Sequence, residues 1–420
     1  MTSIDTTVLP GQPQLTMRPV SAEEFPAFIR VVVELFGEDV NDDDTASDRT
    51  VFEPERSLAV FDGDDIVGTT AIFSRRLRVP GGDVPVAGVT MVGVVSTHRR
   101  RGVATAMMRR QLSDVHDAGE PVAALWASEA AIYPHFGYGM GTRQALLRVT
   151  SADARYRPGV DTGAGQFQQV RLEAAKPALA EIYAAARVHT AGWLDRPPVW
   201  WNYELADSEH RRHGATRLRI VVHEDEAGAR DGYAVYRVKA DWSSEGIKSE
   251  VQVRDLAATG PAAYAAIWRY LLDLDLTATV AKRLAAADEP LQHLVADSRS
   301  VRLTLGDGLW VRVVDVAAAL SARRYSAPID VVVDTSDDFC PWNAGRYRLS
   351  GDDTGAACAR TDDPADLTLT STELGAAYLG GVSLAELAAA GRVREHTLGS
   401  LARASTAFST GRAPWCPEVF

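Results

Sequence analysis

The chain has 420 residues, enough for two to four domains with buried cores. Its 44 Lys and Arg residues against 56 Asp and Glu residues give a net charge of -12. This balance argues against nucleic-acid binding by the whole surface, because duplex binding needs Lys and Arg at the phosphates. A hydrophobic fraction of 46% with 24% charged residues is ordinary for globular proteins and excludes a disordered or fibrous chain.

Membrane and metal sites are not expected either. No apolar run approaches the roughly 20 residues that cross a bilayer, and the first residues lack the charged and apolar segments of a secretion signal. The three cysteines, Cys340, Cys358 and Cys416, are too few and too scattered for a disulfide framework or a four-ligand zinc site. We therefore expect a protein of the reducing cytoplasm that holds no metal and binds neither membrane nor nucleic acid.

The first third of the chain predicts a helix, three strands, a second helix and a short strand. Apolar residues at helical spacing predict the first helix over residues 22–36 and the second over residues 97–118. The strands of an antiparallel meander are expected at residues 57–61, 66–77 and 84–95, with the short apolar strand at residues 122–127.

The remainder of the chain predicts two further units of helices and strands. The middle unit is expected to have helices at residues 172–187 and 261–272 and strands at residues 218–223, 233–238 and 249–255. A last unit, starting near Val301, is expected to have strands at residues 309–314, 329–333 and 347–349 and helices at residues 371–379 and 384–390. The chain closes on the bulky, proline-containing segment 415–420, which we expect to be buried.

The stretch from Met91 to Ala104 is a strand that runs into a helix start and contains the spacing Arg99-x-x-Gly102-x-Ala104. Backbone N–H groups at such a turn, with the positive end of the helix dipole and small residues that allow close approach, suit a pyrophosphate. Three consecutive arginines favour a diphosphate ligand such as coenzyme A. The alternative is a solvated basic helix start, because short motifs often match by chance.

Residues 128–139 read Ser-Glu-Ala-Ala-Ile-Tyr-Pro-His-Phe-Gly-Tyr-Gly. With the Arg-x-x-Gly-x-Ala turn and the order of elements, this run resembles the Eis (enhanced intracellular survival) family of GNAT acetyltransferases. Residues 340–347 and 414–420 are similar to that family's sterol-carrier-like domain and its closing residues. The resemblance implies an α+β fold: a GNAT domain at residues 1–155, a degenerate second GNAT-like domain at 156–300, and a sterol-carrier-protein-like domain at 301–420.

The resemblance also implies an acetyl-CoA-dependent N-acetyltransferase that acts on amines of aminoglycosides or similar polyamine small molecules and forms a homohexamer. By family position, Tyr133 is the general acid and the C-terminal carboxylate of Phe420 the general base. The positions implied for binding acetyl-CoA, the cosubstrate, are Val92, Gly93, Val94, Arg100, Arg101, Gly102, Val103, Ala104, Thr105, Ser128 and Glu129.

The chemistry of amine acetylation agrees with these roles. An ammonium group, with a pKa near 10.4, must lose a proton before it attacks a thioester, so the site needs a base. An α-carboxyl with a reference pKa of about 3.3 to 3.7 becomes a stronger base when Trp415, Val419 and the Phe420 ring desolvate it. A phenol keeps its proton to about pH 10 and suits protonation of the departing thiolate. Backbone amides near Gly93 are expected to polarise the thioester carbonyl.

Other interpretations stay open on sequence grounds. His98 and His135 are rival bases because an unperturbed histidine titrates near pH 6.5. The acidic residues 38–44 and Glu418 are candidates for binding ammonium groups. For the whole protein, the alternatives are a noncatalytic acyl-CoA or lipid-binding module and a protein-lysine acetyltransferase.

Overall fold

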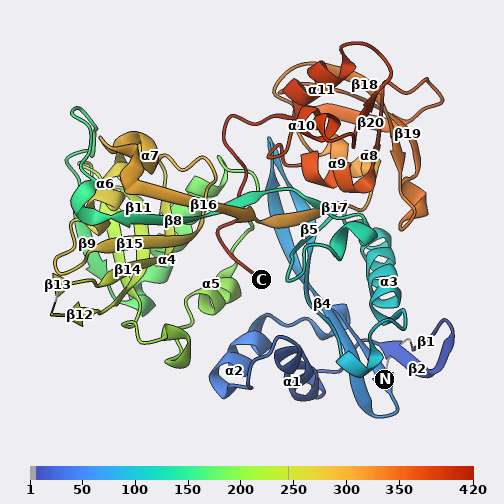
Figure 1. Ribbon diagram of the computed structural model, residues 1–420, viewed down its shortest axis with the longest axis horizontal. Helices are drawn as coiled ribbons and strands as arrows, with labels where there is room; N and C mark the ends of the chain where they lie inside the picture. The colour runs from blue at the N-terminus through green and yellow to red at the C-terminus, as the bar shows by residue number, and fades with distance from the viewer. Residues whose placement is uncertain (1–5, 245) are drawn as a thin grey trace. The chain divides into compact units, whose positions relative to one another are not determined.

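The structure, a computed structural model, describes residues 6–244 and 246–420 (Figure 1). It divides into two compact units. The first contains the residues up to Thr142 together with Gly308–Pro414 and Val419–Phe420, and the second contains Arg143–Asp307 and Trp415–Glu418. Within the described residues, no helix has the length and hydropathy needed to span a bilayer.

The first unit contains an eight-stranded sheet in the order β1-β2-β3-β4-β5-β6-β17-β7. Strands β2 to β5 pair antiparallel in succession, which confirms the predicted meander, and β5 and β6 run parallel. The strands are Thr7–Leu9 (β1), Gln12–Arg18 (β2), Ser57–Asp62 (β3), Asp65–Val79 (β4), Gly82–Val94 (β5), Val122–Trp126 (β6), Gly139–Met140 (β7) and Leu309–Val313 (β17).

Helices α1 (Phe25–Leu35) and α3 (Val103–Asp117) cover opposite faces of this sheet. Successive residues of a strand point to opposite faces, and Ala59 of β3 packs with α1 while Leu58 and Val60 pack with α3. The helix α1 predicted at residues 22–36 is confirmed, although Phe36 lies outside it and is 51% exposed.

A helix that the hydrophobic pattern does not reveal comes after α1. Helix α2 (Asp42–Val51) occupies part of the predicted acidic loop, and only Val51 within it is buried. Its start is fixed by Asn41, whose side chain accepts hydrogen bonds from the N–H groups of Asp43 and Asp44. Capping, with three acidic residues in the first turn, stabilises a helix that has almost no apolar face.

The second unit contains a seven-stranded sheet in the order β16-β8-β15-β14-β11-β10-β9 and a separate pair, β12-β13. Helices α4 and α6 have the predicted bounds. The strands are Arg143–Thr150 (β8), Gln166–Val170 (β9), Arg219–Glu224 (β10), Arg230–Lys239 (β11), Trp242–Ser243 (β12), Gly246–Ile247 (β13), Glu250–Ala258 (β14), Thr279–Ala285 (β15) and Val301–Asp307 (β16). The helices are Leu172–Arg187 (α4), Pro198–Glu204 (α5), Pro261–Leu272 (α6) and Leu291–Leu294 (α7).

The rest of the first unit is a five-stranded sheet in the order β20-β19-β18-β21-β22 with helices α8 to α11. Its strands are Ile329–Ser336 (β18), Gly345–Gly351 (β19), Ala356–Arg360 (β20), Leu367–Thr370 (β21) and Arg394–Glu395 (β22). Its helices are Val316–Ser321 (α8), Ser371–Ala377 (α9), Leu384–Ala389 (α10) and Ser400–Phe408 (α11).

The strand expected at residues 309–314 and a strand that was not predicted, at residues 301–307, join the other sheets instead. Strand β16 pairs with β8, and β17 lies between β6 and β7. All five side chains of β17 are buried, as an interior strand covered on both faces requires. This strand therefore links the last third of the chain to the N-terminal sheet.

A buried ion-pair cluster holds the segment Trp415–Glu418 in the second unit. The Arg196 guanidinium donates to Asp255 Oδ2 and to Glu418 Oε2, each at 2.5 Å. Trp415 meets Trp193 edge to face, with ring centroids 5.2 Å apart. The predicted burial of residues 415–420 is confirmed for Trp415–Glu418 and wrong for Val419, which is 50% exposed, while Phe420 is half-buried. Glu418 is 1% exposed and paired with Arg196, so it is not a free ligand for an ammonium group.

Lys282 lies in the same core. Its Nζ donates to Leu284 O at 2.7 Å and lies 4.6 Å from the centroid of the Trp415 ring. Burial lowers the pKa of the Lys282 ammonium to about 8. The folded protein therefore releases this proton at a lower pH than the unfolded chain does.

We predict that the contribution of Lys282 to the free energy of unfolding, measured as the difference between wild type and Lys282→Met, rises between pH 8 and pH 10.5, because the unfolded chain, with the ordinary lysine pKa of 10.5, still binds the proton that folded Lys282 has lost. The Lys282→Met variant should lack this rise and gain up to about 3 kcal/mol at pH 7. Urea unfolding at several pH values measures both effects. The exposed Lys239→Met variant should keep the wild-type slope, and an unchanged slope in Lys282→Met would contradict the prediction.

Candidate active site

Strands β5 and β6 separate soon after they meet. Among the described residues their pairing covers only Val86–Gly88 with Val122–Ala124. Farther along, β5 carries one extra residue relative to β4, and Met91 adopts a left-handed φ of 55°. The Thr69 hydroxyl donates to Met91 O at 2.8 Å and stabilises this bulge. The bulge turns β5, so its backbone groups beyond Gly88 are available for a ligand.

The predicted carbonyl-polarising segment lies on this separated part of β5. Val92 and Val94 pack partly buried side chains on the core clusters that include α3. Gly93 faces the other side, where a Cβ atom would lie 2.5 Å from Leu35 Cδ1 of α1. Packing against the Leu35 side chain of α1 therefore favours a small residue at position 93.

The arginine-rich turn has the features that an anion site needs. Arg99, Arg100 and Arg101 are exposed, and Gly102, at the N-cap of the 15-residue helix α3, has a φ of 80°. A Cβ atom on Gly102 would meet nothing within 4 Å, so the space in front of the helix is open. Helix N–H groups that point into open space beside three arginines fit a pyrophosphate.

The first turn of α3 offers its backbone rather than its side chains. Val103 is buried in the core at 1% exposure, Ala104 is half-buried and Thr105 is exposed. For the described residues, no side chain caps this helix. The residues assigned to acetyl-CoA here thus fit that cosubstrate as N–H donors at the helix start.

Tyr133 begins the short 3-10 helix η3 (Tyr133–Phe136) that comes after β6. It is 5% exposed and packs in a core cluster with Ala87 and Val89 of β5. Burial raises the pKa of the Tyr133 phenol, a hydrogen bond with Ser128 opposes that shift, and the Glu129 carboxylate adds to it. The phenol therefore keeps its proton at neutral pH.

The chain end reaches the same strand. Phe420 is half-buried, and a Cβ atom on Gly88 would lie 3.1 Å from its ring carbon Cε2. Gly88 is the last residue of β5 that pairs with β6, and its neighbours Ala87 and Val89 pack with Tyr133. Since successive residues of a strand point to opposite faces, the Phe420 ring lies across β5 from the cluster that includes Tyr133, at the point where the two strands separate.

Of the two rival bases, His98 lies outside η3, whereas His135 lies within it, two residues after Tyr133. His98 Nε2 is 3.1 Å from Asp62 Oδ2, and its Nδ1 is 2.9 Å from Thr97 Oγ1. It borders a surface depression of about 730 Å³ that also includes Arg30 and Glu34 of α1. His135 is exposed. Neither histidine belongs to the core cluster around Tyr133.

The cysteines do not form a reactive centre. All three are buried, burial raises the pKa of the Cys340 thiol, and burial raises that of Cys358 to about 12. In the described part of the chain, no three His, Cys, Asp or Glu side chains are grouped to hold a metal ion.

Two glycines that were not among the predicted site residues complete the site. Gly88 provides the flat surface on which the Phe420 ring lies, and Gly137, with a φ of 80°, closes η3. A glycine within an apolar strand is a recognised sign of close approach and was the available indication for Gly88. The separated parallel strands, the anion-binding turn and the buried phenol define the class: an acetyltransferase of the GNAT fold joined to a sterol-carrier-like domain.

Comparisons with known proteins agree with this class. Residues 16–141 and 192–313 each match an acetyltransferase (GNAT) domain family, and residues 316–417 match the sterol carrier protein domain family. The N-acetyltransferase Eis of Mycobacterium tuberculosis is 33% identical over 409 residues, which cover 94% of this chain and 97% of that protein. An uncharacterized N-acetyltransferase of Streptomyces avermitilis is 50% identical over 89% of this chain and 91% of its own.

Solved structures agree as well. The crystal structure of Eis1 from Mycobacterium abscessus is 33% identical, with a TM-score of 0.82 over 97% of this chain and 100% of that one. A GCN5-related N-acetyltransferase from Anabaena variabilis, 20% identical with a TM-score of 0.84 over 97% of this chain and 100% of its own, shares the fold. The chain belongs to the Eis family of GNAT N-acetyltransferases. Enzymes of this class use acetyl-CoA and an amine acceptor.

We predict that Gly102→Glu abolishes acetyl-CoA binding, because it sets a carboxylate against the pyrophosphate at the start of α3. Gly119→Glu is the matched control: Gly119 lies just beyond the other end of this helix, has a φ of 73° and also faces open space. Isothermal titration with acetyl-CoA measures both variants. If Gly102→Glu retains wild-type affinity, the turn is not the pyrophosphate site.

Proposed function

We propose that this enzyme transfers the acetyl group of acetyl-CoA directly to amino groups of aminoglycosides or similar polyamine small molecules, with Tyr133 as general acid and the Phe420 carboxylate as general base. The observation that carries the proposal is the packing of the Phe420 ring on Gly88, where β5 leaves β6, while Ala87 and Val89 on the other face of β5 belong to the cluster that includes Tyr133. A proton acceptor and a proton donor beside one pair of separated strands suit an acyl transfer.

When bound, acetyl-CoA supplies an activated thioester. The Phe420 carboxylate accepts one proton from the acceptor ammonium, and the resulting amine forms the new C–N bond as the C–S bond breaks. Tyr133 Oη donates its proton to the departing thiolate, and its raised pKa keeps that proton in place until then. The amide nitrogen then loses its second proton to solvent, and the phenolate left on Tyr133 takes a proton back from solvent. The backbone of Val92 to Val94 would polarise the thioester carbonyl.

The acceptor class is inferred from charge and resemblance. A net charge of -12 attracts polycationic amines. Asp42, Asp43 and Asp44 in the first turn of α2 add negative charge at a position after α1, where GNAT enzymes build part of the acceptor site. From the family resemblance we further propose a cytoplasmic homohexamer.

We predict that removal of Phe420 abolishes product formation. Intact-mass detection of acetylated aminoglycoside, after incubation with acetyl-CoA, compares the full chain, the chain lacking only Phe420, and Phe420→Leu. The Phe420→Leu variant keeps a carboxylate at the same chain position and should retain most activity, whereas truncation moves the carboxylate by one residue. Activity after truncation would move the base elsewhere, with His98 and His135 tested next.

If no form acetylates any amine of a broad panel although acetyl-CoA binds, the noncatalytic alternative gains support. Acetylation of folded proteins in preference to aminoglycosides would instead indicate a protein-lysine acetyltransferase.

We predict that Tyr133→Phe lowers kcat by about 100-fold or more, the usual contribution of a general acid, with acetyl-CoA affinity nearly unchanged. Tyr325→Phe is the control, because it removes a buried phenol that donates to Leu320 O in the sterol-carrier-like domain. Since burial raises the pKa of Tyr133, the wild-type kcat should show no loss from this group up to about pH 10. Unchanged turnover in Tyr133→Phe would remove it from the mechanism.

A further inference from the structure

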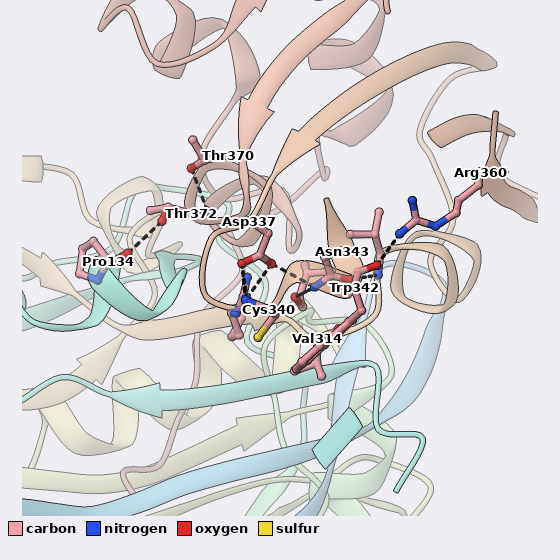
Figure 2. A network of polar contacts seen from close by, with 12 residues as sticks. Pro134, Val314, Asp337, Cys340, Trp342, Asn343, Arg360, Thr370 and Thr372 are labelled. Atoms are coloured by element: carbon pink, nitrogen blue, oxygen red, sulfur yellow. Dashed lines mark hydrogen bonds and ion pairs between the residues drawn. The ribbon is translucent and has the colours of Figure 1, made fainter. Parts of the chain in front are cut away.

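The loop that carries Tyr133, residues 133–139, rests on the sterol-carrier-like part of the first unit. Thr372 of α9 donates to Pro134 O at 3.4 Å, and Figure 2 shows the two residues side by side. The rings of Phe136 and Phe339 meet edge to face, with centroids 5.1 Å apart. Two distant segments of the chain therefore contact this loop.

The closest contact is at Gly137. A Cβ atom on Gly137 would lie 2.6 Å from Arg312 Nη1 and 2.6 Å from Ser371 Oγ. Its φ of 80° is also one that other residues rarely adopt. The loop backbone is thus pressed directly onto the Arg312 guanidinium, with no side chain between them.

Arg312 is itself fixed by a carboxylate. It belongs to β17, is fully buried, and its Nη2 donates to Asp337 Oδ1 and Oδ2 at 2.8 and 2.6 Å. Asp337 also accepts hydrogen bonds from Cys340 N at 2.9 Å and from Asn343 Nδ2 at 3.1 Å, as Figure 2 shows. The carboxylate is therefore oriented from several sides, and it orients the guanidinium in turn.

The charge of Arg312 does not change in the working pH range. Burial disfavours the charged form of Arg312, but the neighbouring Cys340 and Asp337 outweigh that effect and raise the pKa of the guanidinium. Arg312 is therefore a fixed, charged support beneath the loop rather than a proton carrier.

We propose that Arg312 and Asp337 are positioning residues for the general acid. Through Gly137 the buried pair supports the loop and fixes the Tyr133 phenol against β5, although neither residue touches the reacting atoms. The inference rests on the proposed function, in which Tyr133 is the acid. It gives the sterol-carrier-like domain, which supplies Asp337, a part in placing the acid.

Arg312→Lys and Asp337→Asn test the pair, with Arg323→Lys as the matched control. Arg323, like Arg312, is a buried arginine. It lies in the sterol-carrier-like domain and donates to the backbone carbonyls of Tyr378 and Phe408. Full-length proteins labelled with 3-fluorotyrosine report the position of each ring by fluorine NMR. The Tyr133 resonance is the one that is lost in Tyr133→Phe.

We predict that the Tyr133 resonance shifts or broadens in Arg312→Lys and Asp337→Asn and stays in place in Arg323→Lys. In parallel, kcat should fall about tenfold or more, as misplacement of a catalytic group predicts, while KM for acetyl-CoA changes less than about twofold. An unmoved Tyr133 resonance in both variants would overturn the proposal. Phe339→Leu, which removes the ring contact to Phe136, replaces them if neither charge variant folds.

A double variant separates positioning from a general structural role. If the pair acts through Tyr133, adding Arg312→Lys to Tyr133→Phe should lower kcat no further. A further loss of about tenfold would overturn the proposal. If Tyr133→Phe alone leaves kcat unchanged, the proposed acid is wrong, and the fluorine resonance still decides whether the pair positions the ring.

Discussion

The chemistry of the site depends on two parallel strands that stop pairing. Once β5 leaves β6 after Gly88, its backbone groups need other partners, and the bulge at Met91 fixes the direction in which it turns. The carboxyl ends of parallel strands lie at the same edge of a sheet, and so do the loops that begin there. The end of β5 leads toward the arginine-rich turn before α3 and the end of β6 toward the Tyr133 loop, so these two segments begin at the same edge of the sheet.

Each of the two units contains a buried arginine that is paired with carboxylates. Arg196 neutralises Asp255 and Glu418 inside the second unit, and Arg312 neutralises Asp337 inside the first. A buried ion is tolerated only with an oriented partner, and removing one partner typically costs about 3 to 5 kcal/mol. Such pairs specify which segments meet, whereas apolar packing specifies mainly that they are buried.

Strongly patterned elements could be predicted from sequence, and polar or fully buried ones could not. Helices α4 and α6 have the expected bounds because their buried residues recur at helical spacing along the helix, and α6 also begins at a proline. Helix α2 was missed because Asn41 and charge stabilise it instead of an apolar face. Strand β17 was predicted as a strand. Because its side chains are buried on both faces, its sequence does not indicate which strands it pairs with, and its place between β6 and β7 was not predictable.

The same distinction holds for the site. The turn at Gly102 and the run around Tyr133 are local motifs that can be recognised in the sequence alone. The contacts of Phe420 with Gly88 and of Gly137 with Arg312 join residues far apart in the chain, and no local pattern encodes them. The charge of Glu418 is evident from the sequence, but its partner Arg196 is not.

The burial of Cys340, Cys358 and Cys416 has a practical consequence for following turnover. A thiol reacts with disulfide dyes only as an accessible thiolate. With the enzyme's own sulfurs enclosed, the coenzyme released in each cycle would be the thiol that such a dye titrates. The absorbance of the released dye would then measure turnover. Unfolding would expose the three cysteines and cause a sudden additional rise in absorbance.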